Sequence, residues 1–186
     1  MAPIPKAIPS VLAEHLEQLA MLWEQREGAQ RSPDFLREDA AELDERLEAH
    51  VDGLLFAGDE ADALLEEGLK SDEAAGAFAA AYVLLRQKTQ ASADCVVDAF
   101  LEAQEDQLSG IRQALCHGPI KSIEQRLRDV CESKEPAAAI AALEVLAYHE
   151  KATGLLHRLF DYYADENPAV RQAAWRITAM LPDTAL

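Results

Sequence analysis

The strongest constraint on the fold of this chain is a repeat in the second half of its sequence. From residue 71 onward, segments with a helical pattern begin at steps of about 30 to 33 residues, near Asp72, Glu105, Glu135 and Asn167. Three of them share an acidic or polar start, a middle of small residues and a bulky apolar end: SDEAAGAFAAAYVL, KEPAAAIAALEVL and ENPAVRQAAWRIT. Pro136 and Pro168 fall in the first turn, where a helix does not need a backbone N–H. The repeat therefore predicts stacked helical units.

A second helix is expected between successive segments. Pairs of large apolar residues four positions apart mark these helices: Val96 and Phe100, Ile123 and Leu127, and Leu155 and Leu159. Helix–turn–helix units at this period build an α-solenoid, in which neighbouring units share one continuous core. The abundance of Ala, Leu, Glu and Gln, with only 8 Gly and 8 Pro, also argues against an all-β fold. We therefore predict an all-α protein made of antiparallel helix pairs.

The last segment, NPAVRQAAWRITAMLPD, resembles the first helix of a HEAT-type repeat. Asn167-Pro168 supplies the cap and first turn, Val170 and Arg171 follow, and two alanines allow close helix contact. The resemblance implies a HEAT-like α-solenoid over residues 71–186, with 71–166 as looser copies. The sequence stops at PDTAL, where a partner helix normally begins, so the predicted array ends on a half-repeat. Its uncovered apolar edge predicts either a homodimer or cover by the C-terminal residues.

Residues 11–70 predict a helical portion that precedes the repeats. Prolines in the first ten residues predict an extended N-terminal arm over 1–10, with Ser10 as the cap of a first helix. A second helix carries apolar residues at alternating spacings of three and four: Leu36, Ala40, Leu43, Leu47, Val51 and Leu54. Gly58 is expected to end it, and Asp59 to cap a shorter third helix. The portion and the repeats are predicted to form one continuous solenoid domain.

The overall charge limits the partners of the chain. It has 17 Lys and Arg against 34 Asp and Glu, a net charge of −17. Such a field repels nucleic acid and anionic lipid, so we expect neither a nucleic acid nor a membrane as partner. No apolar run is long enough to span a bilayer, and no signal-peptide pattern opens the chain. Three cysteines without a CxxC pair suit a reducing compartment, and we predict a cytoplasmic protein.

The negative charge is concentrated between residues 38 and 73. This stretch holds fourteen Asp or Glu and two bases, Arg46 and Lys70, a net charge of −12. Helical spacing places Glu38, Glu42, Glu45 and Asp52 on one stripe opposite the leucines, with Glu48 beside them, and repeats the arrangement at Asp59, Asp62 and Glu66. Two interpretations stay open. The stripe is either a solvated face that keeps the protein soluble, or the docking site of a basic protein.

A second candidate contact is the turn at Asp161, Tyr162 and Tyr163. Adjacent tyrosines cannot both point into the core from one helix, so at least one is expected to be partly exposed. An aromatic ring flanked by acids suits an interface anchor. The alternative is that one tyrosine only caps the core between two repeats.

The N-terminal third carries a second resemblance. His15, Ala20, Leu22-Trp23 and Arg26, followed by LDERLEAHVDGLLFAGDEA at 43–61, resemble the opening of an uncharacterised proteobacterial HEAT-like family. Its members are often encoded beside type VI secretion effectors. The resemblance implies an immunity protein that neutralises such an effector, a nuclease being one case, by covering its basic surface. The alternatives are an adaptor in secretion or effector assembly and, more remotely, an enzyme on a HEAT scaffold.

The sequence offers little for catalysis. His149-Glu150 resembles the His-Glu pairs with which some HEAT-repeat hydroxylases hold a di-iron centre, but those enzymes need several pairs and this chain has one. No Ser-His-Asp order, P-loop, GxGxxG or HExxH pattern occurs. We therefore expect no enzymatic activity, no catalytic residue, no cofactor and no metal.

Overall fold

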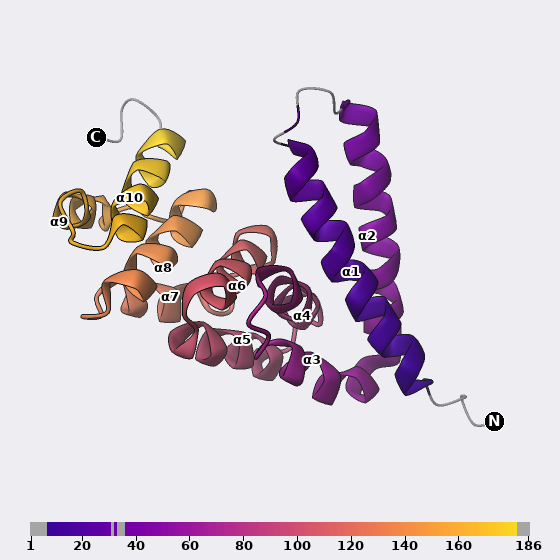
Figure 1. The fold of residues 1–186 in the computed structure, drawn as a ribbon. Helices are drawn as coiled ribbons and strands as arrows, with labels where there is room; N and C mark the ends of the chain where they lie inside the picture. Colours follow the sequence, from indigo (N-terminus) through magenta and orange to yellow (C-terminus); the bar gives the residue numbers. More distant parts are fainter. Residues whose placement is uncertain (1–6, 31, 33–35, 182–186) are drawn as a thin grey trace.

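The computed structural model describes residues 7–30, 32 and 36–181, and every regular element in these ranges is a helix (Figure 1). The prediction of an all-α protein is therefore confirmed. A hairpin of two long helices stands at one end of the molecule, and shorter helices continue from its base toward the other end. No helix of this part is long and apolar enough to cross a membrane.

The hairpin consists of α1 (Pro9–Gln30) and α2 (Arg37–Ala57). Helix α1 begins at Pro9, two residues earlier than predicted, so Pro9 and Ser10 belong to its first turn and not to an extended arm. The carbonyl of Ile8 accepts a hydrogen bond from the N–H of Val11 at 2.9 Å, which closes that turn. Proline suits this position because it needs no N–H there. Residues 1–6 of the expected N-terminal arm lie outside the described residues.

The apolar stripe of α2 is buried along only part of the helix. Leu47, Val51 and Leu54 are in the core, whereas Leu43 is half-buried and Leu36 is 63% exposed. The prediction of one continuous seam is therefore wrong for the first half of α2. Helix α4 packs on both helices of the hairpin, and its contacts extend along α1 as far as Trp23, whose ring stacks on that of Phe78. The indole N–H of Trp23 also donates to Gln113 of α6 at 2.9 Å.

The link after α2 differs from the expected helix cap. Helix α2 ends at Ala57, and Gly58 follows with φ of 57°, a conformation that glycine adopts without strain. A 3₁₀ turn, η1 (Gly58–Ala61), leads directly into α3 (Asp62–Gly68). Asp59 lies inside this turn and does not cap α3, whose N-cap is Ala61. The prediction for Asp59 is corrected accordingly.

The remaining chain forms two alternating sets of helices. The first set is α4 (Ala74–Arg86), α6 (Glu105–His117), α8 (Pro136–Tyr148) and α10 (Pro168–Met180). Each member begins within two residues of its predicted start, and each packs on the next. Between them lie α5 (Gln90–Glu102), α7 (Glu124–Cys131), and the 3₁₀ turn η2 (Leu156–Arg158) with the short α9 (Leu159–Tyr162).

The core runs through α4 and α8. Residues 77–85 of α4 and 138–147 of α8 are all buried, which explains why both helices are apolar on every side. Helices α4 and α6 approach closely at Gly110. A Cβ at this position would lie 2.1 Å from the carbonyl oxygen of Ala74, so only glycine fits.

Candidate functional site

Four acidic residues form a row along α2, and we call Glu38, Glu42, Glu45 and Asp52 the acidic row. All four side chains are exposed. None of them forms an ion pair or a hydrogen bond within the described part of the chain. The predicted placement on a solvent-facing stripe agrees with this geometry, while the role of the stripe stays a prediction.

Several acids outside the row form ion pairs with arginine. Arg126 binds Asp94 at 2.7 Å and Asp98 at 2.6 Å, and Arg158 binds Glu132 at 3.2 Å. Exposed acids such as Glu102, Glu150 and Glu166 also form no ion pair in the described part, so the row is distinguished by the alignment of its four carboxylates on one face of a single helix.

Glu48, predicted to lie beside the acidic row, is half-buried and paired. Its carboxylate turns toward α4, where Arg86 donates to both of its oxygens at 3.0 and 2.9 Å. The hydroxyl of Tyr82 also donates to Glu48 at 3.2 Å. The hydrogen bond from Arg86 lowers the pKa of Glu48 below its usual value. Glu48 therefore ties the base of the hairpin to α4.

An exposed aromatic ring continues the acidic row. Phe56 follows Asp52 by one helical turn on α2, and its side chain is 88% exposed. Its exposure could not be predicted from the sequence, because Phe56 stands in the apolar run Leu54, Leu55 and Phe56, a pattern typical of core residues. Its spacing from Asp52 was the available signal for its alignment with the row. An exposed phenylalanine beside carboxylates gives the row an apolar contact point.

The three other predicted acids lie beyond α2 and do not form a second row. Asp59 and Glu66 are exposed, on η1 and α3 respectively. Asp62 is half-buried and accepts a hydrogen bond from Nε2 of Gln87 at 2.8 Å. Asp62 therefore helps to hold α3 to the end of α4.

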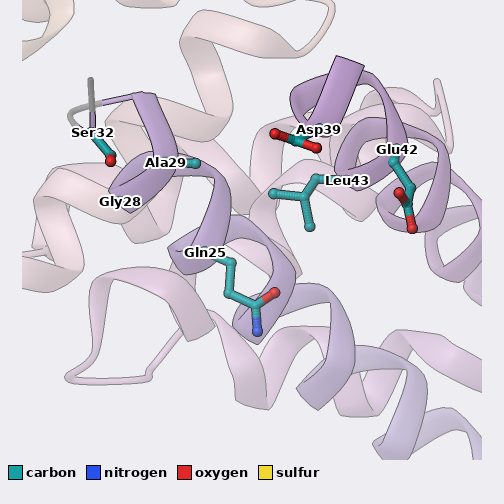
Figure 2. Close-up of a pocket in the computed structure, with 7 residues that line it drawn as sticks. All are labelled: Gln25, Gly28, Ala29, Ser32, Asp39, Glu42 and Leu43. Atoms are coloured by element: carbon teal, nitrogen blue, oxygen red, sulfur yellow. The ribbon is translucent and has the colours of Figure 1, made fainter. Parts of the chain in front are cut away.

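The tip of the hairpin contains a hollow of about 510 Å³ between the ends of the two helices (Figure 2). Gly28, Ala29 and Leu43 form its apolar part, and Asp39 and Glu42 stand on its α2 side. Asp39 accepts the N–H of Leu36 at 3.1 Å and so fixes the start of α2. Glu42, a member of the acidic row, thus borders an apolar depression.

A second acidic hollow, of about 600 Å³, lies where α1 meets α4 and α6. Its carboxylates come from three separate regions of the sequence: Glu24, Glu27, Asp72, Glu73 and Asp106. No lysine or arginine lines it within the described residues. This grouping could not be predicted from the sequence, because the three regions are far apart in the chain and only its folding brings them together.

The side chains of Asp161, Tyr162 and Tyr163 contact other residues of the chain. Tyr162 is buried, and its hydroxyl accepts a hydrogen bond from Arg158 at 3.3 Å. Tyr163 is half-buried, as expected for one of the pair, and its hydroxyl lies 2.6 Å from Oγ1 of Thr178. Asp161 is exposed and lies 3.5 Å from Arg158. The exposed rings near this turn are those of Phe160 and Trp175.

The structure offers no obvious chemical centre in its described part. No group of three or more His, Cys, Asp or Glu is arranged to hold a metal there. Burial raises the pKa of the Cys116 and Cys131 thiols to about 12, so neither is a thiolate at neutral pH. The most buried acid, Glu144, accepts hydrogen bonds from Arg112 at 2.7 Å and Arg176 at 2.9 Å, which completes a structural ion cluster.

Three surface features of the described part are therefore the candidate sites: the acidic row with Phe56, the hollow at the hairpin tip, and the acidic hollow beside α4. Comparisons of the chain with protein-family models, with curated proteins and with solved structures gave no significant match.

Proposed function

We propose that the chain binds a basic protein through the acidic row. The observation that supports this proposal is the alignment of four exposed carboxylates on one face of α2. Arginines neutralise several acids in other parts of the molecule, whereas none of these four forms an ion pair among the described residues. A cationic partner would supply the missing charges.

The energetics favour an external partner. Glu38 and Glu42 are one helical turn apart, as are Glu42 and Glu45, so the row destabilises α2 by a few tenths of a kcal/mol per pair. Binding of lysine or arginine side chains would remove this repulsion. The net charge of −17 would also speed encounter with a basic protein through long-range attraction.

Phe56 and the hollow at the hairpin tip would add apolar contacts to this electrostatic attraction. The ring of Phe56 continues the row at its C-terminal end, and the hollow beside Glu42 lies toward the other end. Interfaces draw most of their energy from a few aromatic or apolar anchors within a polar surround. The partner that fits is a basic surface with at least one apolar side chain.

Within this proposal, the biological role is that of an immunity protein in the cytoplasm. The resemblance of residues 15–61 to a family encoded beside type VI secretion effectors supports this role. A nuclease effector is a suitable target, because its substrate-binding surface must be cationic to hold phosphates. The α4–α10 segment would form a HEAT-like stack that holds the hairpin at one end. An adaptor role would use the same surface without protecting cells.

The test is co-expression with the protein encoded by the neighbouring effector gene, scored for cell survival and for complex formation by pull-down. The test variant replaces Glu38, Glu42, Glu45 and Asp52 by Lys. The control variant makes the same change in charge at four exposed acids elsewhere, Glu102, Asp129, Glu150 and Glu166. We expect the test variant to lose binding and protection and the control to keep both.

Three results would overturn parts of the proposal. Equal binding by both variants would remove the acidic row as the site. Loss of binding only when Asp72, Glu73 and Asp106 become Lys would move the site to the acidic hollow beside α4. A stable complex without protection of cells would replace the immunity role by the adaptor role. The contribution of Phe56 is tested with Phe56→Ala, expected to weaken binding about tenfold or more, with Phe56→Tyr as control.

A further inference from the structure

The outward side of α10 has no helix packed on it in the described part of the chain, whereas α10 covers the corresponding side of α8. Pro136 and Pro168 both occupy the first turn of their helix, so positions in α8 correspond to positions 32 residues later in α10. Four buried positions of α8 are exposed in α10: Ile140, Leu143, Glu144 and Ala147 correspond to Gln172, Trp175, Arg176 and Ala179. Helix α10 packs on α8, and no described helix packs on α10 in the same way.

Aromatic side chains gather at this uncovered end. Trp175 is 61% exposed and Phe160 is 72% exposed. The ring of Tyr163 lies between them, with its centroid 4.7 Å from that of Trp175 and 6.0 Å from that of Phe160. The hydrogen bond between Tyr163 and Thr178 fixes the middle ring, so less side-chain freedom is lost on binding. We call Phe160, Tyr163 and Trp175 the aromatic patch.

The segment of the sequence that carries the aromatic patch is balanced in charge. Residues 151–186 contain four basic and four acidic residues, a net charge of zero. Residues 1–150 contain thirteen basic and thirty acidic residues and so carry the whole net charge of −17. A second copy of this acidic chain is therefore repelled least at the α10 end.

We propose that the aromatic patch is the interface of a homodimer in which two copies pack α10 end to α10 end. A two-fold interface uses the same surface on both copies, so that surface must complement itself. The patch meets this requirement because both signs of charge occur on the elements that carry it, with Asp161 on α9, Asp165 in the turn after it, and Arg171 and Arg176 on α10. The three arginines in this region, Arg158 included, make it a poor site for a basic partner. The acidic row stays free, because the hairpin lies at the other end of the molecule (Figure 1).

The test is the mass of the purified 186-residue chain in solution, measured by sedimentation equilibrium over roughly 1 to 200 µM, the range in which a micromolar dimer dissociates. We expect the mass to rise from 20.4 kDa at the lowest concentration to twice that value. Trp175→Glu places a carboxylate in the interface of each copy and is expected to give the monomer mass throughout. Phe56→Glu introduces the same charge at a more exposed ring of the other end and is expected to dimerise like the parent.

A second measurement does not depend on a destabilising change. Trp23 is buried and Trp175 is exposed, and the chain has only these two tryptophans. Acrylamide quenching of their fluorescence is expected to decrease as the concentration rises, and Trp175→Phe should keep the dimer while removing this concentration dependence. A monomer mass at the highest concentration would overturn the proposal. A dimer that survives in Trp175→Glu would also overturn it.

Discussion

The two ends of the molecule use acidic side chains in opposite ways. At the α8–α10 end, Glu144 is only 5% exposed and is held by two arginines. At the hairpin end, the carboxylates of the acidic row lie in solvent without partners. A buried charge is tolerated only with counter-charges and hydrogen bonds, so Glu144 serves the fold. The row makes no such contribution among the described residues, and we propose that it serves contacts with other molecules.

The largest expected effect comes from removing one acid at each end of the molecule and measuring the loss in the free energy of unfolding. We expect Glu144→Ala to lower the free energy of unfolding by about 3 kcal/mol, because Arg112 would be left largely buried without a counter-charge. Glu45→Ala should change it by less than about 0.5 kcal/mol. Urea denaturation followed by circular dichroism measures both values. Similar losses in the two variants would contradict the distinction between a structural and a solvent-facing acid.

Two glycine substitutions compare the packing between α4 and α6 with the packing at the hairpin tip. Gly110→Ala forces a Cβ against the backbone of α4, and we expect a loss of about 2–3 kcal/mol as the two helices separate. Gly28→Ala lies on α1 near the hairpin tip, with no atom within 4 Å of the new Cβ. It should stabilise the protein by about 0.5–1 kcal/mol through the higher helix propensity of alanine. Thermal unfolding of both variants measures the difference, and a loss at both positions would show that the tip is packed after all.

The helices of the second half could be predicted well from the sequence. Small-residue middles, prolines in the first turn and large residues four apart mark helix starts locally, and α4, α6, α8 and α10 begin close to the expected positions. Their arrangement depends on contacts between units and could only be proposed. The hairpin was predicted less well: a stripe of apolar residues identifies a helix, but it does not show that only half of that stripe will be covered.

The candidate surfaces, too, could be predicted only where the signal lies within one helix. Exposure of the acidic row followed from helical spacing within α2. The different fate of Glu48 did not, because it depends on Arg86 from another helix. Phe56 and Trp175 carry sequence signals of core residues, and they are exposed only because no helix covers their side of α2 and α10 in the part of the chain that the structure describes.

A smaller change in stability is expected when the negative charges of the acidic row are removed. Replacing Glu38, Glu42, Glu45 and Asp52 by Gln removes the repulsion along α2, and we expect the free energy of unfolding to rise by about 0.5 kcal/mol. The gain should shrink when salt is raised to about 1 M, since salt screens exposed charges. Replacing Asp94 and Asp98 by Asn, which removes the partners of Arg126, should lower stability instead. A destabilising effect of the row variant would mean that the row has structural partners.

The smallest expected effect concerns a histidine pair in the hairpin. Nδ1 of His15 lies 2.9 Å from Nδ1 of His50, with one imidazole donating to the other, and Gly53 leaves room for the His15 ring. Burial, together with the charges of His15 and Arg46, lowers the pKa of His50 below its ordinary value of 6.5, although Glu14 acts in the opposite direction. Below pH 6.5 the unfolded chain therefore binds a proton that the folded chain resists.

This contribution to stability is complete above pH 6.5 and declines as the pH falls below that value. Because acid also affects stability through other groups, the useful quantity is the difference in unfolding free energy between the parent and His50→Gln, measured from pH 7.5 to pH 5. We expect this difference to shift against the parent as the pH falls. His157→Gln is the matched control, since His157 is exposed at the other end of the molecule and contacts only the carbonyl of Gly154 among the described residues. An equal pH response of the two variants would show that contact with His15 does not hinder protonation of His50.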